Sequence, residues 1–300
     1  MAITNSTTTG DSSALQVLQD LVELTKPRLA TLVLFTTGVG ILVAPVPLPV
    51  ADALAAMVLT ALVVASGTTL NQYMERDVDG LMARTATRPL PTGRLHPQIA
   101  LVFGIAMFVV SVPLLAWVVN PLTAGLGVMA WAVYLFAYTP LKRRSVAAVY
   151  VGALPGATPV LMGWTAATNT LEGPALALFA ILFLWQIPHF IAISIFRRDE
   201  YHAAGLKILP VEYGHRHSIW HMIGTCMGLV VASLLPIFYR VGGPLYTITA
   251  VVLAVGSLAA ALYGVRADAG AKWARSYFFG TLIYLPVLLG VLVVDQLLRY

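Results

Sequence analysis

Nine stretches of this sequence are almost entirely apolar, and each is about as long as a helix that crosses a bilayer. A transmembrane helix needs about 20 predominantly apolar residues. The apolar residues are continuous rather than alternating, which disfavours a transmembrane β-barrel. The sequence therefore predicts an all-α, polytopic membrane bundle of nine transmembrane helices. The expected spans cover residues 29–48, 51–73, 99–119, 121–139, 146–167, 174–196, 218–239, 244–264 and 277–297.

The scarcity of charge supports a membrane location. Asp, Glu, Lys and Arg make up 10% of the 300 residues, whereas 59% are hydrophobic. A soluble domain usually carries about 25% charged residues. This composition excludes a soluble enzyme, a disordered protein and a cytosolic nucleic-acid binder, so the expected surroundings are a lipid bilayer and no nucleic acid. The single cysteine, Cys226, excludes a disulfide framework and a Cys-rich metal site.

The distribution of basic residues predicts how the bundle is oriented. With the N-terminus in the cytoplasm, 16 of the 18 Lys and Arg residues fall on the inner side, and only Arg240 and Arg299 fall outside. Cytoplasmic loops carry such an excess, so we expect the N-terminus inside and the C-terminus outside. Two inner connections, residues 74–98 and 197–217, are long and charged and follow the second and sixth spans. Because exposed loops often carry function, the functional face is expected to be cytoplasmic.

The N-terminal segment is polar and rich in Ser and Thr, without the basic segment and apolar core of a signal peptide. We interpret residues 1–24 as a flexible tail and residues 25–300 as a single transmembrane domain. A basic, acid-poor presequence of the mitochondrial kind is also lacking. The sequence therefore favours the cytoplasmic (inner) membrane of a bacterium.

Oxygen-bearing side chains at the inner end of the second span form the first candidate site. Asn71, Glu75 and Asp79 are spaced four residues apart, so a helix places them within about 80° of one another on one face. Such ligands suit Mg²⁺, which binds one or two carboxylates together with substrate phosphates and water. A solvated helix end with its acids paired to Arg76 and Arg84 is the alternative. Acidic groups at a membrane boundary are costly and usually functional, which favours a metal site.

Two basic segments follow on the inner side. Residues 84–94 (RTATRPLPTGR) contain Arg84 and Arg88, and residues 138–144 (YTPLKRR) contain Lys142. Arginine side chains suit phosphate oxygens because their donors form a planar fork. Each segment taken alone is also typical of simple positive-inside topology.

A mixed cluster marks the inner end of the sixth span. Asp199 and Glu200 lie next to two arginines, and Lys207 follows. Neighbouring acids point about 100° apart on a helix and do not face one ion squarely. A surface charge cluster is therefore as well supported here as a metal site.

The sixth span contains the sequence WQIPHF at residues 185–190. Pro188 is expected to kink the helix, and a kink beside Trp185 and His189 would suit a pocket for a flat ligand. A histidine packed within a bundle is the more common alternative. His217 and His221 lie four residues apart on the next span, but without a third ligand they do not indicate a metal site.

Together these segments resemble the membrane-embedded prenyltransferase superfamily typified by 4-hydroxybenzoate polyprenyltransferases. The first superfamily motif, NDxxDxxxD, corresponds to residues 71–79, and the YxxxK motif corresponds to residues 138–142. The chain is most similar to the haem-farnesylating branch. That similarity rests on TKPR at 25–28, RPLPTGR at 88–94, WQIPHF at 185–190, AG at 204–205 and LP at 209–210.

The chain departs from the superfamily pattern in three places. Gln72 and Glu75 replace two aspartates of the first motif, although both keep oxygen donors. A second acidic motif would fall at Arg197 and Tyr201, neither of which is acidic. Lys207 stands where the haem branch tends to have proline.

The resemblance implies transfer of a farnesyl group from farnesyl diphosphate to a vinyl group of haem B, with addition of water, giving haem O. It implies Mg²⁺ as the cofactor, and supply of the product to haem A synthase or to terminal oxidase assembly. The implied catalytic residues are Asn71, Glu75 and Asp79, and the implied metal ligands are these three with Asp199 and Glu200. The implied diphosphate-binding residues are Arg84, Arg88, Lys142 and Lys207, and the implied haem-binding residues are Trp185 and His189.

Two other functions stay open. Another prenyltransferase of the same superfamily would act on a quinone precursor or a chlorophyllide, although the altered second acidic motif and WQIPHF disfavour it. A membrane transporter would place ionisable groups near the middle of the bilayer. The acids of this chain instead gather at the inner ends of the spans.

Overall fold

Helices account for all regular secondary structure in the part of the chain that the computed structural model describes, residues 14–266 and 269–299. The all-α prediction is thus confirmed for these residues. The elements in chain order are α1 (Ala14–Leu24), α2 (Pro27–Val43), α3 (Val50–Asp79), α4 (Pro97–Val118), α5 (Pro121–Ala132), the π-helix η1 (Val133–Tyr138), α6 (Thr139–Leu141), α7 (Ala148–Thr168), α8 (Gly173–Phe196), α9 (Arg198–Ala203), α10 (Leu209–Glu212), α11 (Gly214–Phe238), α12 (Pro244–Tyr263) and α13 (Ala271–Leu297).

Seven helical segments in the described residues are long and apolar enough to cross a membrane. They are α3, α4, the continuous segment α5–η1–α6, α8, α11, α12 and α13. The pair α1 and α2 passes the same test when taken together, although the two helices bend by 48°, so the number rises to eight if they form one span. The fifth predicted span is the helix α7, which does not pass. Each of the nine predicted spans is largely helical in the structure. That the chain crosses the membrane nine times stays a prediction.

The outward faces of the long helices are apolar. Trp117 on α4 is 84% exposed, and Phe238 on α11 is 79% exposed. Patches of this kind on many helices would be unfavourable in water, whereas the acyl chains of a bilayer cover them without cost. The chain is therefore a multi-pass membrane protein.

The helix α1 departs from the predicted flexible tail. Residues 1–13 lie outside the described part of the chain, but residues 14–24 form a helix that packs through Leu24. Its Asp20 is buried and lies 3.4 Å from the guanidinium of Arg94. The Ser- and Thr-rich composition at the start of the sequence favoured a tail. The buried positions Asp20 and Leu24 lie four residues apart, which is the spacing of one helix face.

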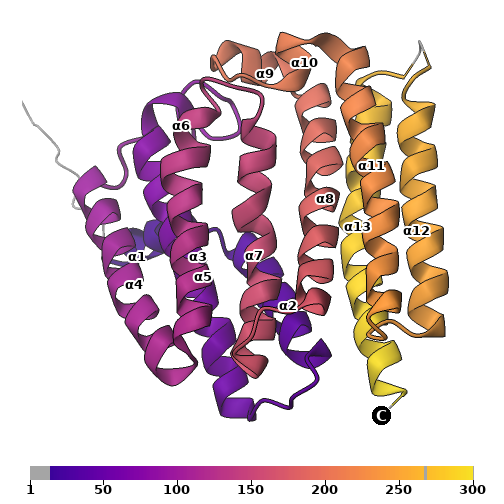
Figure 1. Ribbon diagram of the computed structural model, residues 1–300. Coiled ribbons are helices and arrows are strands. Elements are labelled where there is room, and N and C mark those ends of the chain that lie inside the picture. Colours follow the sequence, from indigo (N-terminus) through magenta and orange to yellow (C-terminus); the bar gives the residue numbers. More distant parts are fainter. Residues whose placement is uncertain (1–13, 267–268, 300) are drawn as a thin grey trace, which may run out of the picture.

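Both long connections lie at one end of the bundle, where α6, α9 and α10 are also found (Figure 1). The connections are shorter than predicted, because α3 continues to Asp79 and α11 begins at Gly214. The helix α7 packs against α2, α5 and α8. On its other side α8 packs against α11 and α13, and α12 packs against both of these helices.

Facing glycines bring α2 and α7 into close contact. A Cβ atom added at Gly40 would lie 2.3 Å from the carbonyl oxygen of Val160, and one added at Gly163 would lie 2.0 Å from that of Thr37. Small residues let membrane helices approach until their backbones touch. This contact sets the distance between α2 and α7.

Candidate active site

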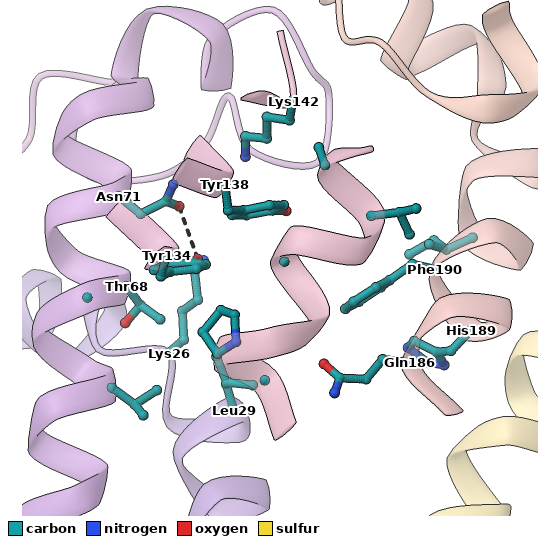
Figure 2. A pocket seen from close by; sticks show the side chains of 18 of the residues that line it. Lys26, Leu29, Thr68, Asn71, Tyr134, Tyr138, Lys142, Gln186, His189 and Phe190 are labelled. Carbon is teal, nitrogen blue, oxygen red and sulfur yellow. Dashed lines mark hydrogen bonds between the residues drawn. The ribbon is translucent and has the colours of Figure 1, made fainter. Parts of the chain in front are cut away.

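A cavity of about 560 Å³ lies among α2, α3, η1, α7, α8 and α13. Figure 2 shows Asn71, Tyr138 and Lys142 on one side of it, and Gln186 and His189 on the other. Nine of the eleven residues predicted for the site line this cavity: Asn71, Glu75, Asp79, Arg84, Arg88, Lys142, Lys207, Trp185 and His189. One cavity is therefore lined by charged side chains on one side and by the aromatic rings of Trp185 and His189 on the other.

The acidic row of α3 borders the charged side. Asn71, Glu75 and Asp79 are each 3% exposed, so they do not form a solvated helix end. The side chain of Asn71 donates a hydrogen bond from Nδ2 to Oε2 of Glu75 at 2.9 Å and another to Oγ1 of Thr139. Its Oδ1 accepts a hydrogen bond from the hydroxyl of Tyr134 at 3.3 Å. Contacts from the η1–α6 segment thus hold the row in place.

Two cations reach the same row from other elements. Lys142 Nζ lies 2.5 Å from Glu75 Oε2, and Arg88 Nη1 lies 2.6 Å from Asp79 Oδ2. Burial lowers the pKa of Lys142, but the neighbouring Tyr138 and the charge of Glu75 outweigh it, so this pKa lies above its usual value. The ammonium group of Lys142 therefore stays charged at any physiological pH. Glu75 and Asp79 are thus each neutralised by one cation.

The acidic row fits a divalent cation. Each carboxylate uses one oxygen for its cation, and Glu75 Oε1 is buried without a hydrogen-bond partner. Burying such an oxygen without a partner is costly, and a metal ion supplies the missing interaction. Carboxylate and amide oxygens are the ligands that Mg²⁺ prefers. The described residues hold no group of three His, Cys, Asp or Glu side chains placed to bind a metal.

The second predicted acidic cluster is not part of the cavity wall. Asp199 is exposed on α9, and Glu200 forms an ion pair with Arg197 at 2.6 Å. Neither residue lines the cavity. Their position next to the end of α8 in the sequence suggested a ligand role, but the structure does not bring them into the cavity lining with the row on α3.

The two remaining predicted cations lie at the edge of the cavity. Arg84 is exposed and has no ion-pair or hydrogen-bond partner among the described residues. Lys207 pairs with Glu212 at 2.9 Å, and its backbone N–H donates to the carbonyl oxygen of Lys142. That backbone bond ties the connection between α9 and α10 to the end of α6.

Trp185 and His189 of α8 form the aromatic side. The two rings stack with centroids 5.0 Å apart. Thr281 of α13 holds both, because its carbonyl accepts a hydrogen bond from Trp185 Nε1 at 3.0 Å and its hydroxyl lies 2.7 Å from His189 Nδ1. A flat apolar ligand fits against such a surface.

Sequence reasoning gave no role to three residues that line the cavity, although two of them, Lys26 and Tyr138, lie in the TKPR and YxxxK motifs. Lys26 lines it from the break between α1 and α2, in a left-handed backbone conformation with φ of 52°, and has no ion-pair partner among the described residues. Tyr134 and Tyr138 stack 5.4 Å apart on η1. A lysine directly before a proline at the start of an apolar span was the available signal for Lys26. The π-helix has no counterpart in the hydrophobic pattern.

Comparison with known proteins identifies the family. The sequence model of the UbiA prenyltransferase family matches residues 33–283. The chain belongs to this family. It is 46% identical to the protoheme IX farnesyltransferase of Myxococcus xanthus over 94% of this chain and 96% of that protein. It is 45% identical to the enzyme of the same name from an Anaeromyxobacter species over 96% and 97% of the two chains.

Solved structures of UbiA proteins share the fold. A digeranylgeranylglyceryl phosphate synthase superposes with a TM-score of 0.80 over 94% of this chain and 99% of that chain, at 17% identity. A UbiA homologue from Archaeoglobus fulgidus bound to DMAPP and Mg²⁺ superposes with a TM-score of 0.65 over 92% and 99%, at 18% identity. At these identities the likeness concerns the fold alone.

Proposed function

We propose that this UbiA protein transfers the farnesyl group of farnesyl diphosphate to a vinyl group of haem B, giving haem O and diphosphate. The allylic C–O bond breaks and diphosphate leaves. The terminal vinyl carbon then bonds to the farnesyl cation, and water captures the new cation next to the ring and loses a proton. The observation that carries this proposal is the single cavity that joins buried acids and cations to an aromatic wall.

The charged side suits the departing diphosphate. Lys142, Arg88 and Arg84 would bind its oxygens, with Lys207 at the edge of the cavity. Lys142 and Arg88 are already held in the cavity by carboxylates. Donors positioned before the reaction stabilise developing negative charge without reorganisation. Breaking the allylic bond needs that stabilisation, because both electrons leave with the diphosphate.

Asn71, Glu75 and Asp79 would hold Mg²⁺ beside these cations. When bound, the ion neutralises the diphosphate oxygens as a Lewis acid. The free oxygen of Glu75 and the burial of the row support this assignment. Structures of a UbiA homologue from Archaeoglobus fulgidus bound to Mg²⁺ with DMAPP or GPP support the class of cofactor.

The aromatic side suits the acceptor. Trp185 and His189 would border the bound porphyrin, whose body is flat and apolar. The surrounding helices exclude bulk water from the cavity, which protects a carbocation from early capture. Three relatives at 45–46% identity are named protoheme IX farnesyltransferase, which supports haem as the acceptor.

We also propose that residues 25–300 form one domain of nine spans in a bacterial inner membrane, with the N-terminus in the cytoplasm. The end of the bundle that carries α6, α9 and α10 would then face the cytoplasm, where most basic residues lie. Substituted-cysteine labelling in a Cys226→Ala background would test the orientation. Labelling of a cysteine at exposed Arg84 from outside intact cells would contradict it.

The direct test of the function is a membrane assay. Membranes with and without the protein are incubated with haem B, farnesyl diphosphate and Mg²⁺, and the extracted haems are analysed by mass spectrometry. We expect a haem that has gained a farnesyl and a hydroxyl group, and that is absent with a chelator. Folded protein that binds farnesyl diphosphate but leaves haem B unchanged would instead indicate another aromatic acceptor.

A further inference from the structure

The ring of His189 is packed among three aromatic side chains. Trp185 stacks on it with centroids 5.0 Å apart, and Phe278 of α13 lies 4.6 Å away. Phe190 approaches edge-on at 5.5 Å. Within this packing the imidazole still lines the cavity, so its ring edge is the part with which it can bind a molecule there.

The direction of the hydrogen bonds around Thr281 identifies which nitrogen is available. The Thr281 hydroxyl donates its single proton to the carbonyl oxygen of Phe278 at 2.5 Å. With that proton directed to the carbonyl, the hydroxyl accepts in its 2.7 Å contact with His189, and this hydrogen-bond network assigns the imidazole proton to Nδ1. The other nitrogen, Nε2, is then unprotonated and keeps its lone pair. It has no hydrogen-bond partner among the described residues.

We propose that His189 Nε2 is the axial ligand of the haem iron while haem is held as the acceptor substrate. This inference rests on the proposed function. A metal-binding histidine typically donates its other ring N–H to a fixed acceptor, which sets the tautomer and raises the basicity of the ligating nitrogen. The chain from His189 through the Thr281 hydroxyl to the Phe278 carbonyl supplies that arrangement. Neutral imidazole is also the common protein ligand of haem iron.

Axial ligation would give the enzyme a fixed point for its acceptor. A porphyrin held only by stacking can slide and rotate in its plane, whereas an iron–nitrogen bond fixes the centre of the ring. The Trp185 indole is itself fixed by the Thr281 carbonyl. One residue of α13 therefore sets both the ligand and the ring that stacks on it.

The first test is spectroscopic and does not depend on turnover. Purified protein in lipid nanodiscs is titrated with ferric haem B and followed by absorption and electron paramagnetic resonance. We expect a histidine-ligated spectrum in the parent. His189→Ala should lose it and weaken haem binding by at least the ~10–100-fold that loss of an outer partner costs. Added imidazole should restore the spectrum.

His217→Ala is the matched control, because His217 is an exposed α11 residue that does not line the cavity. It should leave the spectrum unchanged. Retained farnesyl diphosphate binding by His189→Ala shows that the variant is folded. A parent-like spectrum in folded His189→Ala overturns the proposal, whether or not the variant has lost activity.

A second variant keeps the histidine and removes its support. Thr281→Val deletes the hydroxyl that accepts the Nδ1 proton, so the iron–histidine stretching frequency of the ferrous complex should fall. Haem binding should weaken by about 10–100-fold. Thr281→Ser keeps a hydroxyl and should retain the parent frequency. An unchanged frequency in Thr281→Val would overturn the role given to this hydrogen bond.

Iron-free protoporphyrin IX separates ligation from stacking. The parent should prefer haem over this analogue, and His189→Ala should lose the preference, because both molecules present the same ring. This ratio is independent of the fraction of folded protein. A parent that shows the ligated spectrum but makes no haem O would refute the proposed function and leave the ligation intact. Haem O formation without any preference for iron would refute the ligation alone.

Discussion

The substitution Glu75→Gln tests the charged side of the cavity most directly. It keeps the size and shape of the side chain and removes its charge. In the structure, Glu75 Oε2 accepts hydrogen bonds from Lys142 Nζ at 2.5 Å and Asn71 Nδ2 at 2.9 Å. The variant leaves Lys142 without its counterion and removes the unpartnered carboxylate oxygen that we assign to the metal.

The contacts give the expected magnitudes. Removing one partner of a fully buried ion pair costs about 3–5 kcal/mol. The Lys142 side chain is 21% exposed, so water can still solvate part of its charge. We therefore expect the free energy of unfolding to fall by about 1.5–3 kcal/mol, the value of a hydrogen bond to a charged group. The effect on rate should be larger. Loss of one group that stabilises developing charge typically lowers kcat by ~10²–10³, or about 2.7–4 kcal/mol.

The assay is haem O formation in proteoliposomes, measured over a range of Mg²⁺ concentrations. Glu75→Gln should lower kcat and shift the Mg²⁺ requirement upward, while the protein still inserts and melts cooperatively. Glu172→Gln is the matched control, because Glu172 is exposed before α8 and does not line the cavity. Parent activity with an unchanged Mg²⁺ requirement in Glu75→Gln would refute the metal assignment.

Three further substitutions follow from the packing and the ion pairs. Arg88→Met should raise the KM for farnesyl diphosphate by about 10–100-fold, the equivalent of one charge-assisted hydrogen bond, whereas Arg143→Met, at an exposed pair, should leave the KM unchanged. Gly163→Leu should lower the Tm, because its Cβ would meet backbone atoms of α2, whereas Gly125→Leu has open space; equal Tm values would contradict the close crossing. Asp295→Asn should destabilise the fold by about 0.5–2 kcal/mol, since Asp295 accepts hydrogen bonds from the backbone N–H groups of Gly243 and Tyr246 at the start of α12; an unchanged denaturation midpoint would contradict this capping role.

The helices and the acidic row could be predicted because both follow from periodicity. Long apolar runs have few alternatives in a chain with so little charge. The spacing of Asn71, Glu75 and Asp79 places them on one face of any helix, and α3 is regular there. Only their burial required the structure, since the sequence allowed a solvated helix end as well.

The pairing of that row with individual cations could not be predicted, because it depends on how separate segments of the chain pack together. Lys142 meets Glu75 across a sequence separation of 67 residues. The YxxxK motif marks Lys142 as a site residue but does not show which carboxylate it meets, and its neighbour Arg143 pairs with exposed Asp77 instead. The position of Asp199 outside the cavity lining could not be predicted for the same reason: the sequence shows that an acid lies near the end of a span, but not how the next short helix packs.

The pairing of cations with acids also explains how a cavity inside a membrane can hold so much charge before substrate arrives. An unpaired ion in such a place is costly. Lys142 and Arg88 avoid that cost through Glu75 and Asp79. A diphosphate offers oxygens of the same kind, so each cation can exchange a carboxylate for a phosphate oxygen without losing a partner. The carboxylates released by that exchange need a cation in turn, and this is the physical reason to expect diphosphate and Mg²⁺ to bind here together rather than separately.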